Sequence, residues 1–408
     1  MNILDMVKKK KKLLSDLIYT VGASVLMNGV LQLIIYPFIN YRMGEEYLGN
    51  VVFYMSIVYI IGQAMGMSFC SNRLVLRNQC RTTNGDFNAL LRILAPLGGL
   101  VGAVIFSFYT KNVGEILAFG LIVMFTVLRY YANVEYRLKL NYKKYFLYFV
   151  ILTAGYGIGA VIYAFTGQWF WIFLTGEVIA TLYMFVFGTI FKKEARTDNT
   201  RFVAKHILFL LLSYLVFEGI SNADRMILKS LLDAKAVALF YVVSMIGKTL
   251  QLFVGPINNI ALSYMSADKK KMTREDFLKT TLLYVGVGAA FYLVCLVGTP
   301  LYVRLLYPNL YGDLKGLNLV VNAGQVINFA ASLILPSILA SLGSKYHMML
   351  QVLYAVVYLP LAIVFTMQGG IWGFAFATLI ANSLRLIELV VFGMRKLPRA
   401  AEAGRMDE

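Results

Sequence analysis

Basic and amide side chains recur at helical spacing inside apolar stretches of this sequence. In the stretch 236–265, Tyr241, Ser244, Lys248 and Gln251 fall on one helical face, because positions three or four residues apart lie on the same side of a helix. Lys248 lies near the middle of this stretch, where an ionised side chain costs about 2.5–3.5 kcal/mol in hydrocarbon. Its ammonium must therefore face water, an anion or a carboxylate.

A second polar face runs along the stretch 206–231. Tyr214, Glu218, Asn222, Arg225 and Lys229 share this face if the stretch is one continuous helix. Two structural alternatives remain open for the cations. Lys248 could form an ion pair with Glu218 on the neighbouring face, and Arg225 and Lys229 could extend from a helix end to the membrane boundary.

Three further stretches carry stripes of amides and hydroxyls. They are Ser24, Asn28, Gln32 and Tyr36 in 17–39; Ser56, Tyr59, Gln63, Gly66 and Cys70 in 47–70, continued by Arg73 and Arg77; and Asn318, Asn322, Gln325 and Ser332 in 316–340. Each amide alone could equally form a hydrogen bond between helices, worth about 0.6 kcal/mol. The alignment of five stripes favours a shared hydrated cavity, and its Lys and Arg residues favour phosphate or diphosphate groups.

Acidic residues are scarcer than basic ones, with 21 Asp and Glu against 38 Lys and Arg. Only Glu177, Glu218 and Asp224 lie deep within apolar stretches. A cavity for cationic drugs would need unpaired carboxylates, so this balance favours an anionic cargo. Glu218 and Asp224 are candidates for coupling to Na⁺ or H⁺, while Arg385 is expected to pair with Glu388, three residues further on.

The chain as a whole has the composition of an integral membrane protein. Its mean hydropathy is +0.70 and 59% of its residues are hydrophobic, and about 20 apolar residues suffice for a helix to cross the hydrocarbon core. We expect an all-α fold with about twelve transmembrane helices. The predicted spans are 17–39, 47–70, 89–109, 114–133, 145–166, 168–191, 206–231, 236–265, 278–300, 316–340, 346–366 and 370–393.

Lys and Arg residues concentrate in alternate connections between these spans, beginning with Lys8 to Lys12. Basic residues mark the cytoplasmic side of a membrane protein, so both termini are expected in the cytoplasm, in a multi-pass protein of the cell membrane. The net charge of +17 would then meet anionic lipid. Nucleic acid is the weaker explanation of that charge.

The polar segment 192–205 divides the spans into two sets of six. We expect a lobe of residues 1–196 and a second of residues 197–408, arranged around a central cavity. The three cysteines and two histidines lack the spacing of a metal site. No metal, cofactor or catalytic residue is expected, and no motif for nucleotide hydrolysis is present, so a driving force would come from an ion gradient, the membrane potential or product removal.

Two segments of the sequence form recognisable motifs. The first is Tyr41-Arg42-Met43-Gly44-Glu45-Glu46-Tyr47-Leu48-Gly49, leading into a span that ends Met65-Gly66-Met67-Ser68 with Arg73 just beyond it. The second is Asn222-Ala223-Asp224-Arg225-Met226-Ile227-Leu228, followed by residues 236–241 and Lys248. Both segments resemble the polysaccharide transporter (O-unit flippase) family of the multidrug/oligosaccharidyl-lipid/polysaccharide (MOP) exporter superfamily. These motifs cover about 80 residues.

The resemblance implies a two-lobed flippase that moves a polyprenyl-diphosphate-linked oligosaccharide from the cytoplasmic to the outer leaflet by alternating access. Arg73 and Arg77 would attract the headgroup, Lys248 would receive the diphosphate, and Arg225 and Lys229 would hold it during release. The glycan hydroxyls would bind replaceable amides, namely Asn28, Gln32, Gln63, Gln251, Asn322 and Gln325. Its partners would be the lipid-linked substrate, membrane lipids and proteins of glycan assembly.

Three other classes of protein fit the sequence less well. A cation or drug antiporter of the same superfamily conflicts with the excess of basic groups. A membrane polymerase or ligase would need a substantial external loop with catalytic residues, and the expected external loops are short. A structural scaffold would have little use for five aligned polar faces.

Overall fold

The computed structural model of this chain describes residues 3–77, 81–254, 258, 273–342 and 344–398, and the side chains of all of these except 3–14, 336, 339–342, 344, 345, 347 and 348. Every regular element within these residues is helical. Eleven of the described helices are long and apolar enough to cross a membrane. The structure therefore confirms the expected all-α membrane fold; the end of the predicted span 236–265 lies outside the described residues.

The two last predicted spans form one element of the structure, α17 (Ser344–Lys396), which is broken at Gly370. The apolar part of α17 runs over 48 residues, about 70 Å at 1.5 Å per residue, which is more than twice the thickness of the hydrocarbon core. Gly370 has a φ of 57° and a ψ of −140°, a conformation that is open to glycine and strained for other residues. The predicted spans 346–366 and 370–393 meet at this break.

The chain forms two compact units, which divide it at other positions than the predicted lobes. The first unit comprises residues 1–39 and 51–223, and the second comprises residues 40–50 and 224–408. Helix α10 (Thr200–Ser221), which falls in the predicted lobe 197–408, packs against α4 (Ala64–Leu76) and thus belongs to the first unit. The segment 40–50, which lies inside the predicted lobe 1–196, belongs to the second.

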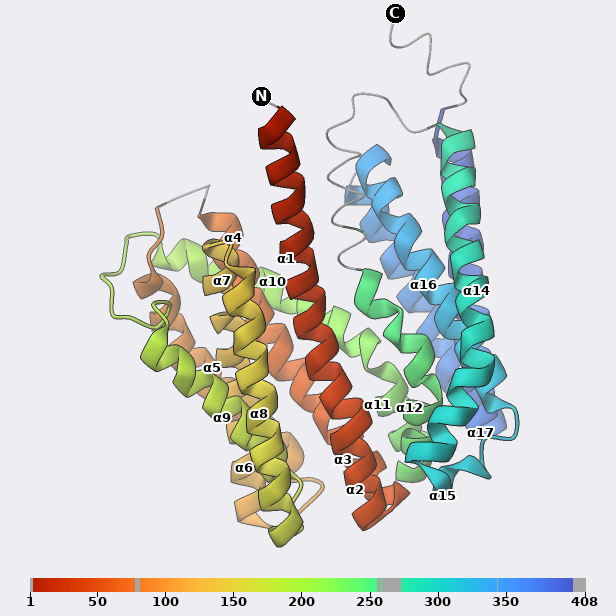
Figure 1. The fold of residues 1–408 in the computed structure, drawn as a ribbon, viewed down its shortest axis with the longest axis horizontal. Helices are drawn as coiled ribbons and strands as arrows, with labels where there is room; N and C mark the ends of the chain where they lie inside the picture. Colours follow the sequence, from red (N-terminus) through yellow and green to blue (C-terminus); the bar gives the residue numbers. More distant parts are fainter. Residues whose placement is uncertain (1–2, 78–80, 255–257, 259–272, 343, 399–408) are drawn as a thin grey trace, which may run out of the picture. The chain divides into compact units, whose positions relative to one another are not determined.

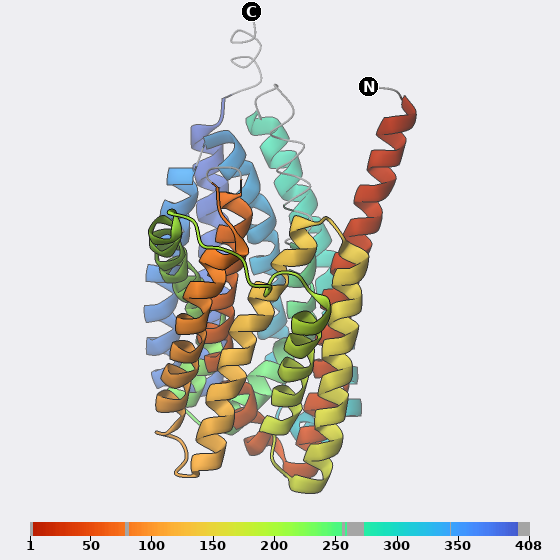
Figure 2. The ribbon, with the colours of Figure 1, turned by 90° about the vertical axis from the view of Figure 1, so that its left-hand side faces the viewer.

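The first unit is a bundle of helices (Figure 1). Besides α4 and α10, its elements are α1 (Ile3–Val30), η1 (Leu31–Ile35), most of α3 (Glu45–Val58), η2 (Tyr59–Gln63), α5 (Asn84–Phe106), α6 (Val113–Ala132), α7 (Val134–Leu138), α8 (Tyr142–Thr166) and α9 (Phe170–Phe187). Figure 2 shows α6, α8 and α9, coloured orange to yellow-green, running side by side. Helix α9 packs against both of the others.

Glycines explain why these helices approach so closely. Gly155 and Gly159 on α8 face α9, and a Cβ added to Gly159 would lie 2.6 Å from the Cα of Ile172. Gly98 and Gly102, on α5, have the same small-residue spacing, and an added Cβ would meet Met65 and Val123 respectively at 2.7 Å. Small residues at such positions allow close backbone contact between helices in a membrane. Both glycine pairs therefore serve helix packing.

Two short π-helical turns interrupt the first two spans. η1 lies between α1 and α2 (Tyr36–Met43), and η2 lies between α3 and α4. They contain Gln32 and Gln63, respectively. π-helical turns carry one extra residue in a helical turn and are often found at functional sites.

The predicted span 206–231 is not one continuous helix. α10 ends at Ser221, and α11 (Ala223–Leu231) begins after Asn222, whose φ of −109° and ψ of 9° leave the helical geometry. The Asn222 side-chain amide donates to the Glu218 backbone carbonyl oxygen at 2.9 Å. This bond helps to satisfy the carbonyl groups at the C-terminal end of α10. The predicted polar face is therefore divided: Glu218 lies in the first unit, and Arg225 and Lys229 lie in the second.

The second unit contains α11, α12 (Ala234–Thr249), α14 (Arg274–Leu306), α15 (Pro308–Tyr311), α16 (Leu317–Leu342) and α17, together with the segment 40–50. Helix α16 packs against α12, α14 and α17 and is the common neighbour in this unit (Figure 1). Phe277, Ile334, Ile338 and Leu389 are among the buried residues that join α14, α16 and α17.

Gly159→Ala is expected to destabilise the protein by about 1–3 kcal/mol, because overpacking forces the α8 and α9 backbones apart. The midpoint of thermal unfolding of the purified chain in detergent measures the effect. Gly157→Ala, on the same helix, is the matched control, since an added Cβ there meets nothing within 4 Å and alanine favours a helix. Equal midpoints for the two variants would contradict the packing argument.

Candidate functional site

Lys248 forms an ion pair with Asp224 inside the second unit. The Lys248 Nζ lies 2.6 Å from the Asp224 Oδ2, and 26% of the lysine side chain and 9% of the aspartate side chain are exposed. Asp224 lies in the first turn of α11 and Lys248 in the last turn of α12. This cation was expected to face water, an anion or a carboxylate, and the structure provides a carboxylate. It belongs to Asp224 and not to Glu218, the partner that the sequence left open.

The two other cations of α11 also have partners in the second unit. The Arg225 guanidinium carbon lies 5.2 Å from the ring centroid of Tyr241, within the range of a cation–π interaction. Lys229 donates to the Asn50 Oδ1 at 2.7 Å. The side chains of Arg225 and Lys229 are half-buried. Together with Asp224, they place three charged side chains within six consecutive residues of α11.

The amides of the second unit differ in how fully they are engaged. Gln251 is half-buried, and its Nε2 is buried and has no hydrogen-bond partner among the described residues. Gln325 is 6% exposed and packs its aliphatic carbons against Gly247. Asn322 is fully buried: its Oδ1 accepts from the Gly247 amide, and its Nδ2 donates toward Val243, Thr299 and Asn318. Asn322 thus has the contacts of a residue that joins α12, α14 and α16.

Glu218 belongs to a separate polar cluster in the first unit. The Gln63 Nε2 donates to the Glu218 Oε1 at 2.6 Å, and the Tyr130 hydroxyl donates to the Gln63 Oε1 at 2.5 Å. Asn222 makes a longer contact of 3.5 Å with the Glu218 Oε2. Gln63 therefore bridges α6 and α10 from the π-helical turn η2, which explains one use of that turn.

The polar residues of α1 interact mainly with their own helix. The Asn28 Nδ2 donates to the Ser24 carbonyl oxygen at 2.8 Å, and the Ser24 hydroxyl donates to the Thr20 carbonyl oxygen at 3.3 Å. Gln32 is half-buried in η1. The hydrogen bonds of Ser24 and Asn28 in the predicted stripe are therefore local.

Arg73 and Arg77 contact connections within the first unit. Arg73 donates to Thr82 and Asn84, at 3.3 and 3.2 Å, and lies 5.3 Å from the ring centroid of Phe87. Arg77 is exposed and donates to the Leu138 carbonyl oxygen at 3.1 Å. Arg73 is thus engaged with the start of α5, whereas Arg77 remains accessible at the end of α4.

The third deep carboxylate, Glu177, pairs with Arg129. The Arg129 Nε lies 2.6 Å from the Glu177 Oε2, and their side chains are only 2% and 3% exposed. The Tyr156 hydroxyl donates to the other carboxylate oxygen at 3.2 Å. The partners are 48 residues apart on α6 and α9, and sequence spacing gives no signal for a pair at such separation.

Arg385 shows a similar departure from sequence reasoning. The predicted Arg385–Glu388 ion pair is not formed in the described part of the chain, where the guanidinium donates to Asn328 at 2.6 Å and to Gln351 at 3.0 Å. It also lies 4.5 Å from the ring centroid of Tyr354. The side-chain amides of Asn328 and Gln351 therefore take the place of Glu388 as partners of Arg385.

The first family-like segment, residues 41–49, is fixed within the second unit. Asn40 and Asn309 exchange amide hydrogen bonds of 2.7 and 3.3 Å, and Asn309 also donates to Glu45 at 2.5 Å. Lys235 lies 3.7 Å from Glu45 and 2.8 Å from Asp313. Gly49 packs directly on Ala234, whose carbonyl oxygen would collide with a Cβ at position 49. This contact is a physical reason for the glycine of the motif.

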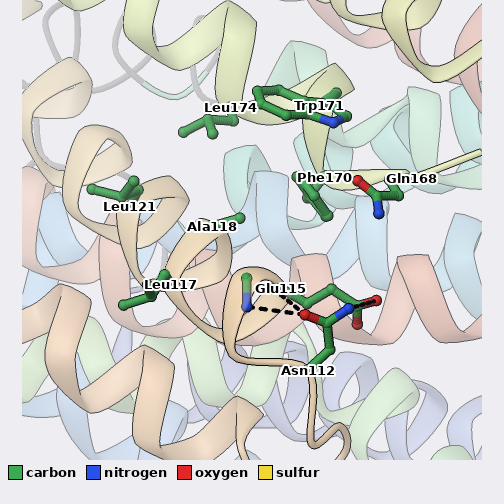
Figure 3. Close-up of a pocket in the computed structure, with 10 residues that line it drawn as sticks. Asn112, Glu115, Leu117, Ala118, Leu121, Gln168, Phe170, Trp171 and Leu174 are labelled. Carbon is green, nitrogen blue, oxygen red and sulfur yellow. Dashed lines mark hydrogen bonds between the residues drawn. The ribbon is translucent and has the colours of Figure 1, made fainter. Parts of the chain in front are cut away.

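A groove of about 300 Å³ opens in the first unit between the starts of α6 and α9 (Figure 3). Leu117, Leu121, Phe170, Trp171 and Leu174 give it an apolar wall, and Asn112, Glu115 and Gln168 lie at its polar side. Asn112 caps α6 by accepting from the amides of Gly114 and Glu115. None of the residues that the sequence suggested for substrate binding lines this groove.

Solved transporter structures are similar to the chain over nearly its whole length. Lipid II flippase MurJ in an inward closed conformation has a TM-score of 0.66 and 15% identity, covering 97% of this chain and 88% of that one. An inward-facing multidrug resistance MATE family transporter of the MOP superfamily has a TM-score of 0.65 and 12% identity, covering 96% of both chains. A MATE in complex with MaD3S has a TM-score of 0.66 and 15% identity, covering 95% and 96%.

Comparison with protein-family models gives no match, and neither does comparison with curated protein sequences. At 12–15% identity, this likeness shows a shared fold: the chain has the all-helical fold of these solved transporter structures. The expected all-α, multi-pass architecture is confirmed at this level.

Glu177→Gln is expected to lower stability by about 3–5 kcal/mol, because it leaves the buried Arg129 without its counter-charge. Thermal unfolding in detergent measures the loss. The double variant Arg129→Met with Glu177→Met should recover most of it, since apolar replacement of both partners of a buried pair is often neutral.

Glu115→Gln is the control for this experiment, because Glu115 lies in the first turn of α6 at the groove and forms no ion pair in the described residues. If the double variant were as unstable as Glu177→Gln, the charge argument would be wrong.

Proposed function

We propose that this chain is a flippase that moves a polyprenyl-diphosphate-linked oligosaccharide from the cytoplasmic to the outer leaflet of the cell membrane, for the synthesis of a surface polysaccharide. The observation that carries the proposal is Lys248, a cation within a predicted span whose side chain is one-quarter exposed. An ammonium in such a place suits a diphosphate, because a charge-assisted hydrogen bond to a phosphate oxygen offsets the cost of keeping the charge there.

The resemblance of two sequence segments to O-unit flippases and the fold shared with a lipid II flippase support the same class of substrate. Arg225 and Lys229 lie on the helix that also carries Asp224, and they would assist Lys248 as the headgroup moves. Arg77, with its exposed side chain, would attract the anionic headgroup at the entrance, with Arg73 beside it.

The amides would bind the glycan in a weak and replaceable manner. Gln251, with an unsatisfied Nε2, is the strongest of these candidates, and Asn28, Gln32, Gln63 and Gln325 are the others. Asn322 is omitted because its amide is fully engaged between helices. Distributed weak binding suits a transporter, which must release what it binds.

The orientation and driving force follow from the sequence argument. Both termini would lie in the cytoplasm, and proteins of glycan assembly would supply and remove the substrate. Glu218 and Asp224 are the candidates for coupling to H⁺ or Na⁺, and no other cofactor is proposed.

A drug antiporter is the second candidate function. It is favoured by two MATE structures whose TM-scores of 0.65 and 0.66 are as high, within 0.01, as the 0.66 of the flippase. Against it stands the pairing of the deep carboxylates: Glu177 binds Arg129, Asp224 binds Lys248, and Glu218 accepts hydrogen bonds from Gln63. A cationic drug would have to compete for each of them.

Lys248→Ala is expected to slow transport of a fluorescent lipid-linked oligosaccharide by about 10-fold or more in liposomes, because a hydrogen bond to a charged group contributes about 1.5–3 kcal/mol. Lys139→Ala is the control, since 52% of the Lys139 side chain is exposed and its partner Glu135 also accepts from the backbone amides of Thr189 and Ile190. The double variant Lys248→Met with Asp224→Asn removes the charges together and should stay slow.

Recovery of transport in that double variant would reduce Lys248 to a structural partner of Asp224. Efflux of ethidium from the same liposomes, with no movement of the lipid-linked glycan, would replace the flippase proposal with the drug antiporter.

A further inference from the structure

The two partners of the Lys248–Asp224 pair differ in accessibility. The lysine side chain is 26% exposed, whereas the aspartate side chain is 9% exposed. The Asp224 Oδ2 accepts from the ammonium, and Oδ1 is buried with no hydrogen-bond partner in the described structure. The carboxylate is thus nearly enclosed, whereas part of the lysine side chain stays accessible.

Lys248 also retains binding capacity. An ammonium has three N–H donors, and one of them is directed at Asp224 Oδ2. The ring of Phe240 lies 5.8 Å from the ammonium and supplies no hydrogen-bond acceptor. A phosphate oxygen could thus bind the same nitrogen, but the negative charge of Asp224 would oppose it at short range.

The surroundings of Asp224 hold this carboxylate in place. It lies at the start of α11, where the helix dipole favours negative charge, and Arg225 is its neighbour in the chain. The pair is the one ion pair that Lys248 or Asp224 forms among the described residues. These surroundings favour the charged carboxylate while Asp224 is paired with Lys248.

From this geometry we infer that Asp224 is an internal competitor of the transported anion: it neutralises Lys248 when the site is empty, weakens the binding of a diphosphate, and reclaims the ammonium when the substrate leaves. This inference rests on the proposed function and assigns a regulatory role to the carboxylate of the same site. Asp224 acts through Lys248 and is thus a positioning residue, with no direct bond to the anion.

A competitor has an effect that a purely structural carboxylate cannot produce. Its removal should strengthen anion binding, because Lys248 is then left with a neutral partner, and charge-assisted hydrogen bonds are about twice as strong as neutral ones. The same change should slow release. Asp224→Asn should accordingly lower the KM for transport and also lower the maximal rate.

The test measures binding of inorganic pyrophosphate to the full chain in lipid nanodiscs, and transport of a fluorescent lipid-linked oligosaccharide in liposomes. Asp224→Asn is expected to bind pyrophosphate about 10-fold more tightly than the unchanged protein, and to transport more slowly at saturating substrate. Asp224→Glu keeps the charge and should restore both values toward those of the unchanged protein. Lys248→Met should lose the binding.

Asp313→Asn is the matched control, because it removes the carboxylate of another Lys–Asp pair in the same unit, Lys235–Asp313, whose side chains are 42% and 36% exposed. It should leave pyrophosphate binding unchanged. Misfolding cannot imitate the expected result, since damage to the protein weakens binding.

The outcomes separate the inference from the proposed function. If Lys248→Met abolishes binding while Asp224→Asn binds equally or more weakly, Asp224 is not a competitor and the flippase proposal stands. If neither the unchanged protein nor any variant binds pyrophosphate, the diphosphate site and the inference are both wrong.

Discussion

Charge in a hydrocarbon environment must be neutralised or hydrated, and this constraint organises the polar groups of the protein. Arg129 and Glu177 meet it by closing a pair whose side chains are almost inaccessible. Lys248 and Asp224 meet it with a pair that is accessible from the lysine side. The same physical requirement thus yields one contact suited to holding helices together and one suited to exchanging partners.

Breaks in the helices place several of these groups. η2 positions Gln63 between Tyr130 and Glu218, and the interruption at Asn222 separates Glu218 from the charged residues of α11. Close glycine contacts hold neighbouring helices together in the first unit, as between α8 and α9. Helices of the first unit thus pack closely at their glycines and depart from α-helical geometry at η2 and at Asn222, where polar side chains meet their partners.

The sequence predicted the helical membrane fold well because hydropathy reports directly on the environment of a long segment. The spacing of polar residues also singled out Lys248, Gln63 and Glu218, which make polar contacts in the structure. Asp224 was named only as a deep carboxylate, and the open alternative for Lys248 was a pair with Glu218. That alternative assumed that 206–231 is one continuous helix, whereas the structure breaks at Asn222. Asparagine is favoured at helix ends, but apolar residues continue on both sides of Asn222, so hydropathy alone did not mark the break.

Contacts between distant residues were beyond the reach of sequence spacing. Arg129 and Glu177 are 48 positions apart, and Arg385 selects Asn328 and Gln351 over its near neighbour Glu388. Periodicity describes one helix at a time, so it cannot tell which helices become neighbours. The fully engaged amide of Asn322 shows the same limit: a polar residue on a helical face can be a packing contact as readily as a binding group.

The segment 40–50 has a further consequence for any attempt to divide the molecule. It is encoded near the beginning of the chain, yet Asn309, Lys235 and Ala234 are its contacts, so the polypeptide passes between the compact units three times. A fragment ending at the polar segment 192–205 would carry these residues away from their contacts and would also lose α10 from α4. The two halves of the gene consequently do not encode two self-contained folding units, and recombination at their midpoint would exchange incomplete bundles.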